Sequence, residues 1–261
     1  MGVYNCAGTL PEALDSLMSQ TYRGFKIIMC DDRSTDGTYS VAQRYAEKYD
    51  NIILLKNDRN LKLAATLNRC LEYADTEYVA RMDGDDISLP GRFEKEINFL
   101  DHHPEYGFVS TAMIYFDESG DWGVGRPTEK PTKNDFTKGS PFCHAPCMVR
   151  ASAFQAVGGY TDRPSLERLE DYYLWYKFYV NGFSGFNLTE PLYKMRDDKS
   201  AMLRRKFRHR IEGFKINLEV FRGLDLPYPY LYATLHFLKA FIPRFIMRLT
   251  RKILMSNLIS K

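Results

Sequence analysis

An apolar run that stops at three carboxylates is the feature that most constrains this fold. Residues 78–82 end at Asp83, and Asp85 and Asp86 follow after a single glycine. An apolar run of this length is typical of a buried strand in an α/β sheet, and ligands of such sheets bind just beyond the carboxyl ends of the strands. Carboxylates this close repel one another unless a cation or hydrogen-bond donors neutralise them. The stretch therefore predicts a cation site in a crevice at a strand end.

Oxygen ligands of this kind favour Mg²⁺ or Mn²⁺. Proteins usually hold these ions with one or two carboxylates and leave the other positions to water and substrate phosphates. A second strand-like run, residues 25–30, also ends in acids, at Asp31 and Asp32. Taken alone, that pair is typical of a turn that caps a helix. Two acidic strand ends together favour a metal–diphosphate site.

The order of elements predicts an α/β fold. Helical spacing of apolar residues alternates with short apolar runs through the first 82 residues. The helical segments are 10–18, 38–49 and 63–74, and the strand segments are 25–30, 52–55 and 78–82. This alternation predicts a doubly wound, mostly parallel sheet with right-handed crossovers and helices on both faces. The first strand is nearly absent before the loop that begins at Tyr4, so we expect it to be truncated or a stub.

The second half predicts further elements around a long loop. We expect a helix over 89–100, a β-rich segment over 106–116, a strand near 145–149, and a loop over 120–141 that is long enough to act as a lid. Glu170 and Asp171 open another helix. Acids in a first turn are favoured by the helix dipole alone, but a carboxylate there could also accept a proton.

The C-terminal part differs in charge from the rest. Residues 203–261 hold thirteen Lys and Arg against three Asp and Glu, while the whole chain of 261 residues has a net charge of only +3. Cations at 244, 248, 251 and 252 fall on one side of a helical wheel and apolar residues on the other, which is typical of a membrane-surface helix. An amphipathic helix docked on the body is the alternative. No nucleic-acid-reading motif accompanies the basic run 204–210, so we expect no nucleic-acid partner. We predict two parts, 1–202 and 203–261.

The cysteines and the hydropathy indicate the cellular compartment of the protein. Five scattered cysteines form an odd set, which indicates reduced thiols in a cytosolic protein. Cys143 and Cys147 flank His144, but no second pair stands at a matching spacing, so a zinc site is disfavoured. No signal peptide opens the chain and no uncharged run reaches the roughly 18 residues of a membrane span.

Several spaced motifs together carry a resemblance. They are Val3-Tyr4-Asn5, the turn Asp31-Asp32-Arg33-Ser34-Thr35-Asp36-Gly37-Thr38, Asn68, the DXD-type stretch Asp83-Gly84-Asp85-Asp86, Gly158-Gly159-Tyr160, and Glu170-Asp171 with Trp175. In this order they resemble an inverting, nucleotide-sugar-dependent member of glycosyltransferase family 2 with the GT-A fold. The resemblance covers about residues 1–200. The basic tail is similar to those of bacterial exopolysaccharide, capsule and O-antigen transferases.

The resemblance implies a role for particular residues. Val3, Asn5 and Asp32 would contact the nucleotide, with Asp83 on the ribose side. Asp85 would hold Mn²⁺ or Mg²⁺ between the two donor phosphates, and Arg196 would lie near the diphosphate.

The same resemblance implies the acceptor side. Asp171 would be the general base that takes the proton of the acceptor hydroxyl as it attacks the anomeric carbon from the face opposite the diphosphate, which gives inversion. Glu170 would orient the site or contact the acceptor. Two positions depart from the family pattern: Lys62 stands where glycine is usual, and the His that often accompanies the position of Arg196 is missing.

We therefore expect a metal-dependent hexosyl- or N-acetylhexosaminyl-transferase that moves sugar from a UDP-sugar to a hydroxyl of a lipid-linked glycan in cell-surface polysaccharide synthesis. Its expected place is the cytoplasmic face of the bacterial inner membrane, as a peripheral protein bound to the anionic surface. The alternatives are a non-catalytic, membrane-associated assembly factor derived from a transferase, and a metal-dependent nucleotidyltransferase. The latter would need a basic phosphate-binding loop after the first strand, and none is visible in the sequence.

Overall fold

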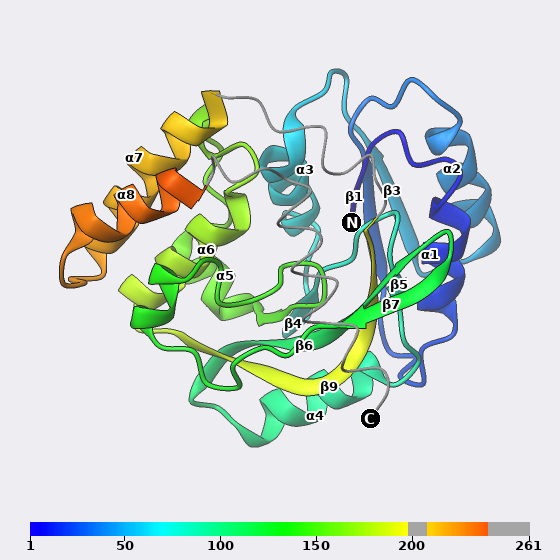
Figure 1. The fold of residues 1–261 in the computed structure, drawn as a ribbon. Coiled ribbons are helices and arrows are strands. Elements are labelled where there is room, and N and C mark those ends of the chain that lie inside the picture. The colour runs from blue at the N-terminus through cyan, green and yellow to red at the C-terminus, as the bar shows by residue number, and fades with distance from the viewer. Residues whose placement is uncertain (198–207, 240–261) are drawn as a thin grey trace.

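The computed structural model describes residues 1–197 and 208–239, which form an α/β fold with helices on both sides of two sheets (Figure 1). The helices are α1 Leu10–Met18, α2 Thr38–Lys48, α3 Lys62–Leu71, α4 Arg92–His102, α5 Ala151–Val157, α6 Glu170–Val180, α7 Arg208–Gly223 and α8 Pro229–Lys239. The strands are β1 Gly2–Val3, β2 Ile27–Asp31, β3 Ile52–Lys56, β4 Tyr78–Ala80, β5 Ile87–Ser88, β6 Tyr106–Asp117, β7 Gly120–Val124, β8 Met148–Arg150 and β9 Ser184–Arg196. Two short 3-10 helices, η1 Lys133–Thr137 and η2 Pro164–Leu166, complete the described elements.

The first sheet confirms the predicted alternation of strands and helices. It has the order β1-β2-β3, and both of its pairings are parallel. Strand β1 has only two residues, yet Val3 pairs with Asp31 and is buried. The short strand therefore still fixes the start of the loop that leads to α1.

The second sheet corrects the prediction of a mostly parallel architecture. Its order is β4-β8-β6-β9-β5, with β7 paired to β6, and of its pairings only β6–β9 is parallel. A parallel neighbour needs a long crossover connection, whereas β6 and β7 are joined by the tight turn after Asp117 and must run antiparallel. Helix–strand alternation ends with β4, so the reasoning that predicts parallel strands applies only before that point.

Two hydrophobic clusters fill the space between these layers. One joins the first sheet to α1, α2 and α4, and the other joins β6 to α3, α5, α6 and α7. In the second cluster the rings of Phe108 and Trp175 stack at 4.8 Å between centroids, and Phe221 of α7 is fully buried. Helices α7 and α8 lie together on the outer side of α5 and α6, on the opposite side of the molecule from α1 and α2 (Figure 1).

The predicted lid over 120–141 is largely anchored to the body. It contains β7 and η1, and Phe136 within η1 is fully buried against the ring of Tyr179. The Tyr179 hydroxyl also donates to the carbonyl of Pro131 at 2.6 Å. Only short stretches between these contacts are left as irregular loop.

The predicted tail is described in part. α7 and α8 cover 208–239, whereas the proposed junction near 202 and the cations at 244, 248, 251 and 252 lie outside the described residues. The division at 202 therefore stays a prediction. Within 1–197 and 208–239, no helix combines the length and hydropathy that a membrane span requires.

Candidate active site

The three carboxylates beyond β4 have different surroundings. Asp83 forms an ion pair with Arg81 at 2.5 Å, and its backbone N–H donates to the Tyr193 hydroxyl at 3.3 Å. Asp86 is buried and accepts a hydrogen bond from the backbone N–H of Arg196 at 2.8 Å. Asp85 is the exposed member of the three. The protein itself therefore provides donors for Asp83 and Asp86, and Asp85 is exposed to solvent.

The charges of this loop act on one another. Burial raises the pKa of the Asp86 carboxyl well above its usual value, and the charges of Asp83 and Asp85 add to the rise. A carboxylate that is destabilised by its neighbours is stabilised by a nearby cation. The acidic loop therefore has the electrostatics of a cation site.

Arg196, the residue expected near the diphosphate, lies against the acidic loop. It stands at the end of β9, and its Nε donates to the carbonyl of Asp85 at 2.9 Å. Its guanidinium also pairs with Glu12 at 2.5 Å and lies 4.5 Å from the centre of the Phe116 ring. These contacts hold a cation beside Asp85.

The first loop meets the acidic loop at Gly84. A Cβ atom on Gly84 would lie 2.8 Å from the Cys6 sulfur and 3.3 Å from a methyl of Val3. The Thr9 hydroxyl also donates to the Gly84 carbonyl at 2.9 Å. Only glycine fits between the two acids at this approach, and the sequence pattern alone did not reveal this contact.

Asp32 and Asn5 are engaged by their own loops. The Asp32 carboxylate accepts hydrogen bonds from the Asn57 side chain at 2.8 Å and from the backbone N–H groups of Leu61 and Lys62 at 2.7 and 2.9 Å. The Asn5 side-chain oxygen accepts from the backbone N–H of Thr35 at 2.8 Å. Both residues thus shape the loops at the ends of β1 and β2, while the backbone N–H of Asp32 donates to the carbonyl of Val3.

Asp171 and the acidic loop both contribute charge to the surroundings of two buried side chains. Burial is the main cause that raises the pKa of the Tyr160 hydroxyl well above its usual value. Cys147 and the charges of Asp171 and Asp83 raise this pKa further. Burial likewise raises the pKa of Cys143, and both Asp171 and Asp86 add to it. The electrostatic surroundings of Tyr160 and Cys143 therefore include both the first turn of α6 and the end of β4.

Glu170 also starts α6, and burial raises the pKa of its carboxyl above the usual value. Both acids of the pair are half-buried. The side chains of Glu170 and Asp171 are therefore partly shielded from solvent in the first turn of the helix.

The Gly158-Gly159-Tyr160 motif has a structural explanation. Asn68 of α3 accepts from the backbone N–H of Tyr160 and donates to its carbonyl, both at 2.8 Å. Gly159 has φ +67°, and a Cβ there would lie 2.6 Å from the Asn68 oxygen. The Tyr160 hydroxyl in turn lies 2.7 Å from His144 Nε2. Burial lowers the pKa of His144 well below its usual value, so this imidazole is neutral and structural.

The donor set fits a metal that is only partly held by protein. Within 1–197 and 208–239, no group of three or more His, Cys, Asp or Glu side chains is arranged as a complete metal site. Asp85 offers an exposed carboxylate beside destabilised acids, which suits Mn²⁺ or Mg²⁺ completed by water and phosphate oxygens. The thiols of Cys143 and Cys147 are free, and burial raises the pKa of both, so they do not favour zinc.

Comparisons with known sequences agree with this geometry. The sequence model described as "Glycosyl transferase family 2" matches residues 1–158. The Bacillus subtilis (strain 168) protein EpsE is 43% identical over 249 residues, which are 95% of this chain and 90% of EpsE. Amylovoran biosynthesis glycosyltransferase AmsE of Erwinia amylovora is 32% identical over 76% of this chain and 74% of its own length. The Escherichia coli UDP-Glc:alpha-D-GlcNAc-diphosphoundecaprenol beta-1,3-glucosyltransferase WfaP is 27% identical over 75% of each chain.

Solved structures show the same fold at lower sequence identity. S. aureus TarS 1-349 in complex with UDP-GlcNAc superposes with a TM-score of 0.70 at 18% identity, over 90% of this chain and 68% of that one. The chain spans 40% of the longer TarS chain. The mannosyltransferase PcManGT of Pyrobaculum calidifontis, in complex with GDP-Man and Mn²⁺, gives a TM-score of 0.63 at 20% identity, over 90% of this chain and 68% of that one. These likenesses confirm the predicted GT-A fold.

Proposed function

Because this chain belongs to glycosyl transferase family 2, we propose that it is an inverting transferase that moves sugar from a UDP-sugar to a hydroxyl of a lipid-linked glycan in cell-surface polysaccharide synthesis. The observation that carries this proposal is the acidic loop at the end of β4, where Asp85 and Asp86 are bonded to Arg196 through the Asp85 carbonyl and the Asp86 carboxylate. WfaP, a related protein, is named for UDP-Glc and a diphosphoundecaprenol-linked GlcNAc, which supports both substrate classes.

The acidic loop serves the donor in this proposal. A bound Mn²⁺ or Mg²⁺ would stabilise the negative charge that develops on the leaving diphosphate. Asp85 would hold that ion, and Asp83 would face the ribose. Arg196, already bonded to the Asp85 carbonyl, adds a fixed positive charge at the same place.

The nucleoside end of the donor would lie over β1 and β2. Val3, Asn5 and Asp32 meet there, and their loops are fixed by the hydrogen bonds described above. Both Asp32 oxygens accept from the 61–62 backbone, so Asp32 would contact the nucleotide through the remaining acceptor capacity of Oδ2. Alternatively, Asp32 would not contact the nucleotide itself but would hold the backbone of residues 61–62 in the shape that the nucleotide requires.

Asp171 takes the proton on the acceptor side. As the acceptor hydroxyl oxygen forms its bond to the anomeric carbon, its proton passes to an Asp171 oxygen and the bond to the diphosphate oxygen breaks. Attack and departure occur on opposite faces, so the product has inverted configuration. Glu170, next to Asp171 and half-buried, would orient the acceptor.

The decisive experiment removes the proton acceptor and keeps its shape. Asp171→Asn should lower kcat by roughly 10²–10⁴-fold while UDP-sugar binding in the presence of Mn²⁺ changes little. Glu170→Gln serves as the neighbour control and should retain more activity. Equal loss of binding and turnover in Asp171→Asn would remove Asp171 from the role of base. A wild-type chain that binds UDP with Mn²⁺ but never releases UDP from any UDP-sugar would instead support the non-catalytic assembly factor.

We further propose that the C-terminal part binds the anionic cytoplasmic face of the bacterial inner membrane as a peripheral protein. Leu231, Leu235 and Leu238 are 55%, 44% and 55% exposed and repeat at helical spacing on α8. The other side of α8 is fixed to the body through buried Ala233 and through His236, whose Nε2 lies 2.7 Å from the carbonyl of Thr137. The sequence excess of ten positive charges from residue 203 onward would add attraction to anionic lipid.

Vesicle binding separates these contributions. The triple variant Leu231→Ser, Leu235→Ser, Leu238→Ser should co-sediment less with vesicles that contain anionic lipid, while its turnover of a water-soluble acceptor analogue stays unchanged. The wild type should also bind neutral vesicles more weakly. Equal binding of wild type and triple variant to both kinds of vesicle would contradict the membrane assignment of α8.

A further inference from the structure

A fully buried tyrosine contacts the acidic loop of residues 83–86. Tyr193 of β9 has an exposed fraction of 0%, and its backbone pairs with Ser88 of β5 and with Met113 of β6. β5 begins immediately after Asp86, so the strand pairing fixes the register between the loop and the tyrosine. The Tyr193 ring also lies 5.1 Å from the guanidinium of Arg92, which is itself fully buried. The position of the ring is therefore set by strands and packing.

The Tyr193 hydroxyl is bonded to both ends of the acidic loop. It accepts a hydrogen bond from the backbone N–H of Asp83 at 3.3 Å, and the Tyr193 side chain is also hydrogen-bonded to the Asp86 carboxylate. A hydroxyl has one proton to donate and two lone pairs, whereas an ionised carboxylate can only accept, so the hydroxyl donates to Asp86. One oxygen atom thus joins the residues on either side of Gly84 and Asp85.

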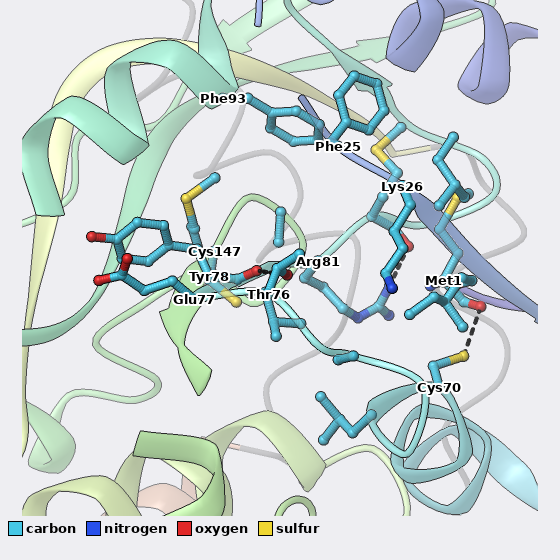
Figure 2. Close-up of a pocket in the computed structure, with 18 of the residues that line it drawn as sticks. Met1, Phe25, Lys26, Cys70, Thr76, Glu77, Tyr78, Arg81, Phe93 and Cys147 are labelled. Carbon is cyan, nitrogen blue, oxygen red and sulfur yellow. Dashed lines mark hydrogen bonds between the residues drawn. The ribbon is translucent and has the colours of Figure 1, made fainter. Parts of the chain in front are cut away.

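A second buried side chain holds the first of these acids. Arg81 is 5% exposed, forms the ion pair with Asp83, and lies at the wall of a cavity of about 390 Å³ (Figure 2). The contacts of Arg81 and Tyr193 engage Asp83 and Asp86, whereas the side chain of Asp85 is exposed. The loop is thus fixed at its two ends from the interior and presents its middle to solvent.

We propose that Tyr193 is a positioning residue that closes residues 83–86 into one preformed turn and presents Asp85 to the divalent cation of the donor diphosphate. This inference rests on the proposed function, in which Asp85 holds that ion. A loop that is already ordered loses less conformational entropy when an ion binds, so the preformed turn raises the affinity for the ion. Loss of the hydroxyl would release both ends of the turn and leave the packing of the ring in place.

Tyr193→Phe tests this role because it removes one hydroxyl and keeps the ring. In the metal-free protein, amide hydrogen exchange of residues 83–86 should become about tenfold faster, while exchange in the paired part of β9 stays unchanged. Titration calorimetry with Mn²⁺ and UDP should give an affinity about tenfold weaker. In turnover, the half-saturating concentration of Mn²⁺ should rise by about the same factor, while kcat at saturating Mn²⁺ stays within about twofold of the wild type.

Tyr45→Phe is the matched control, because the Tyr45 hydroxyl donates to Asp15 at 2.7 Å in a contact between α2 and α1. It should leave the exchange of residues 83–86 and the affinity for Mn²⁺ and UDP at their wild-type values. Equal exchange and equal affinity in Tyr193→Phe and the wild type would overturn the role of Tyr193. Faster exchange throughout β5 and β9 would also overturn it, because the tyrosine would then support the sheet in general.

Two measurements on the wild type complete the test. The amide of Asp83 should be protected from exchange before any metal is added. Rapid exchange of that amide would overturn the preformed turn, even if Tyr193→Phe did not fold. If exchange and affinity change in Tyr193→Phe as expected but the wild type releases UDP from no UDP-sugar, the role of Tyr193 is supported and the transferase proposal fails.

Discussion

The carboxylate of Asp32 holds Lys62 in a backbone conformation that suits glycine. Asp32 accepts hydrogen bonds from the backbone N–H groups of Leu61 and Lys62, and Lys62 has φ +71°. The lysine therefore keeps this loop shape at a cost in strain. A non-glycine residue in this region loses roughly 1 kcal/mol.

Lys62→Gly should therefore stabilise the protein. We expect the free energy of unfolding to rise by about 1 kcal/mol, because glycine removes the clash of Cβ with the backbone. Urea denaturation of the two proteins measures this change. Lys62→Ala is the matched control and should give no such gain, since alanine keeps the Cβ. A gain of equal size in both variants would mean that the lysine side chain, and not the backbone, carries the cost.

Asp85→Asn should weaken the affinity for Mn²⁺ or Mg²⁺. Asn keeps the size of the exposed side chain and removes its charge, so the concentration of metal needed for half-maximal activity should rise about tenfold or more, while Tm without metal stays near the wild-type value. Titration of metal at fixed UDP-sugar measures this. Asp58→Asn, at an exposed position outside the site, is the control. An unchanged metal requirement in Asp85→Asn would transfer the role of ligand to another acid.

The buried pair of Arg92 and Glu96 predicts a pH dependence of stability. Both side chains are fully buried, their charged groups are 3.1 Å apart, and the second Glu96 oxygen has no hydrogen-bond partner. Burial, opposed by Arg92, raises the pKa of Glu96 from its ordinary 4.5 to about 7. Because the folded state holds this proton more tightly, the stabilisation is present below pH 4.5 and is lost as the pH rises through 7. It amounts to about 3 kcal/mol.

Glu96→Gln should remove that dependence, since Gln resembles the protonated acid. Its free energy of unfolding should match the wild type near pH 5 and exceed it by about 2–3 kcal/mol at pH 8. Denaturation of both proteins at the two pH values measures the difference between their free energies of unfolding. The other titrating groups are the same in both proteins, so their contributions cancel. Glu47→Gln, at an exposed helix position, should follow the wild type at both. The difference in free energy of unfolding, Glu96→Gln minus wild type, should increase from pH 5 to pH 8. A decrease would contradict the raised pKa of Glu96.

Phe221→Ala should show that α7 belongs to the folded body. Phe221 is fully buried in the cluster that contains Phe108 and Trp175, so its truncation should cost about 3–5 kcal/mol. Leu238→Ala on α8 is the control, because Leu238 is 55% exposed and should change stability by less than about 0.5 kcal/mol. A small effect at Phe221 would mean that α7 folds separately from the rest.

The sequence predicted the first sheet but not the second. Asp83, Asp85 and Asp171 became candidates because acids at strand ends and helix starts leave a local pattern, and their roles stay predictions. The antiparallel pairings of β6, β8 and β9 join segments far apart in the chain, and no local periodicity encodes them. The parallel strands before β4 could be predicted because each is followed by its own crossover helix.

Partners of the site residues were harder to predict than the residues themselves. Arg81 neutralises Asp83 two positions away, and the signal was a single cation within an apolar strand. The bonds from Asp32 to the 61–62 backbone have no comparable signal, because they depend on how two loops approach in space. The cations at 244–252 could not be compared with structure at all, since they lie outside the described residues.

The contact of Gly84 with Val3 and Cys6 has a mechanical consequence. The peptide that carries Asp83 and Asp85 rests directly on the opening loop of the chain, so in the proposed function the spacing between nucleoside and metal would be set where these two loops touch. A shift of a few tenths of an ångström in the opening loop would be transmitted to both carboxylates. In the proposed function, catalytic alignment would thus depend on the order of the first few residues, about eighty positions away from Asp85 in sequence.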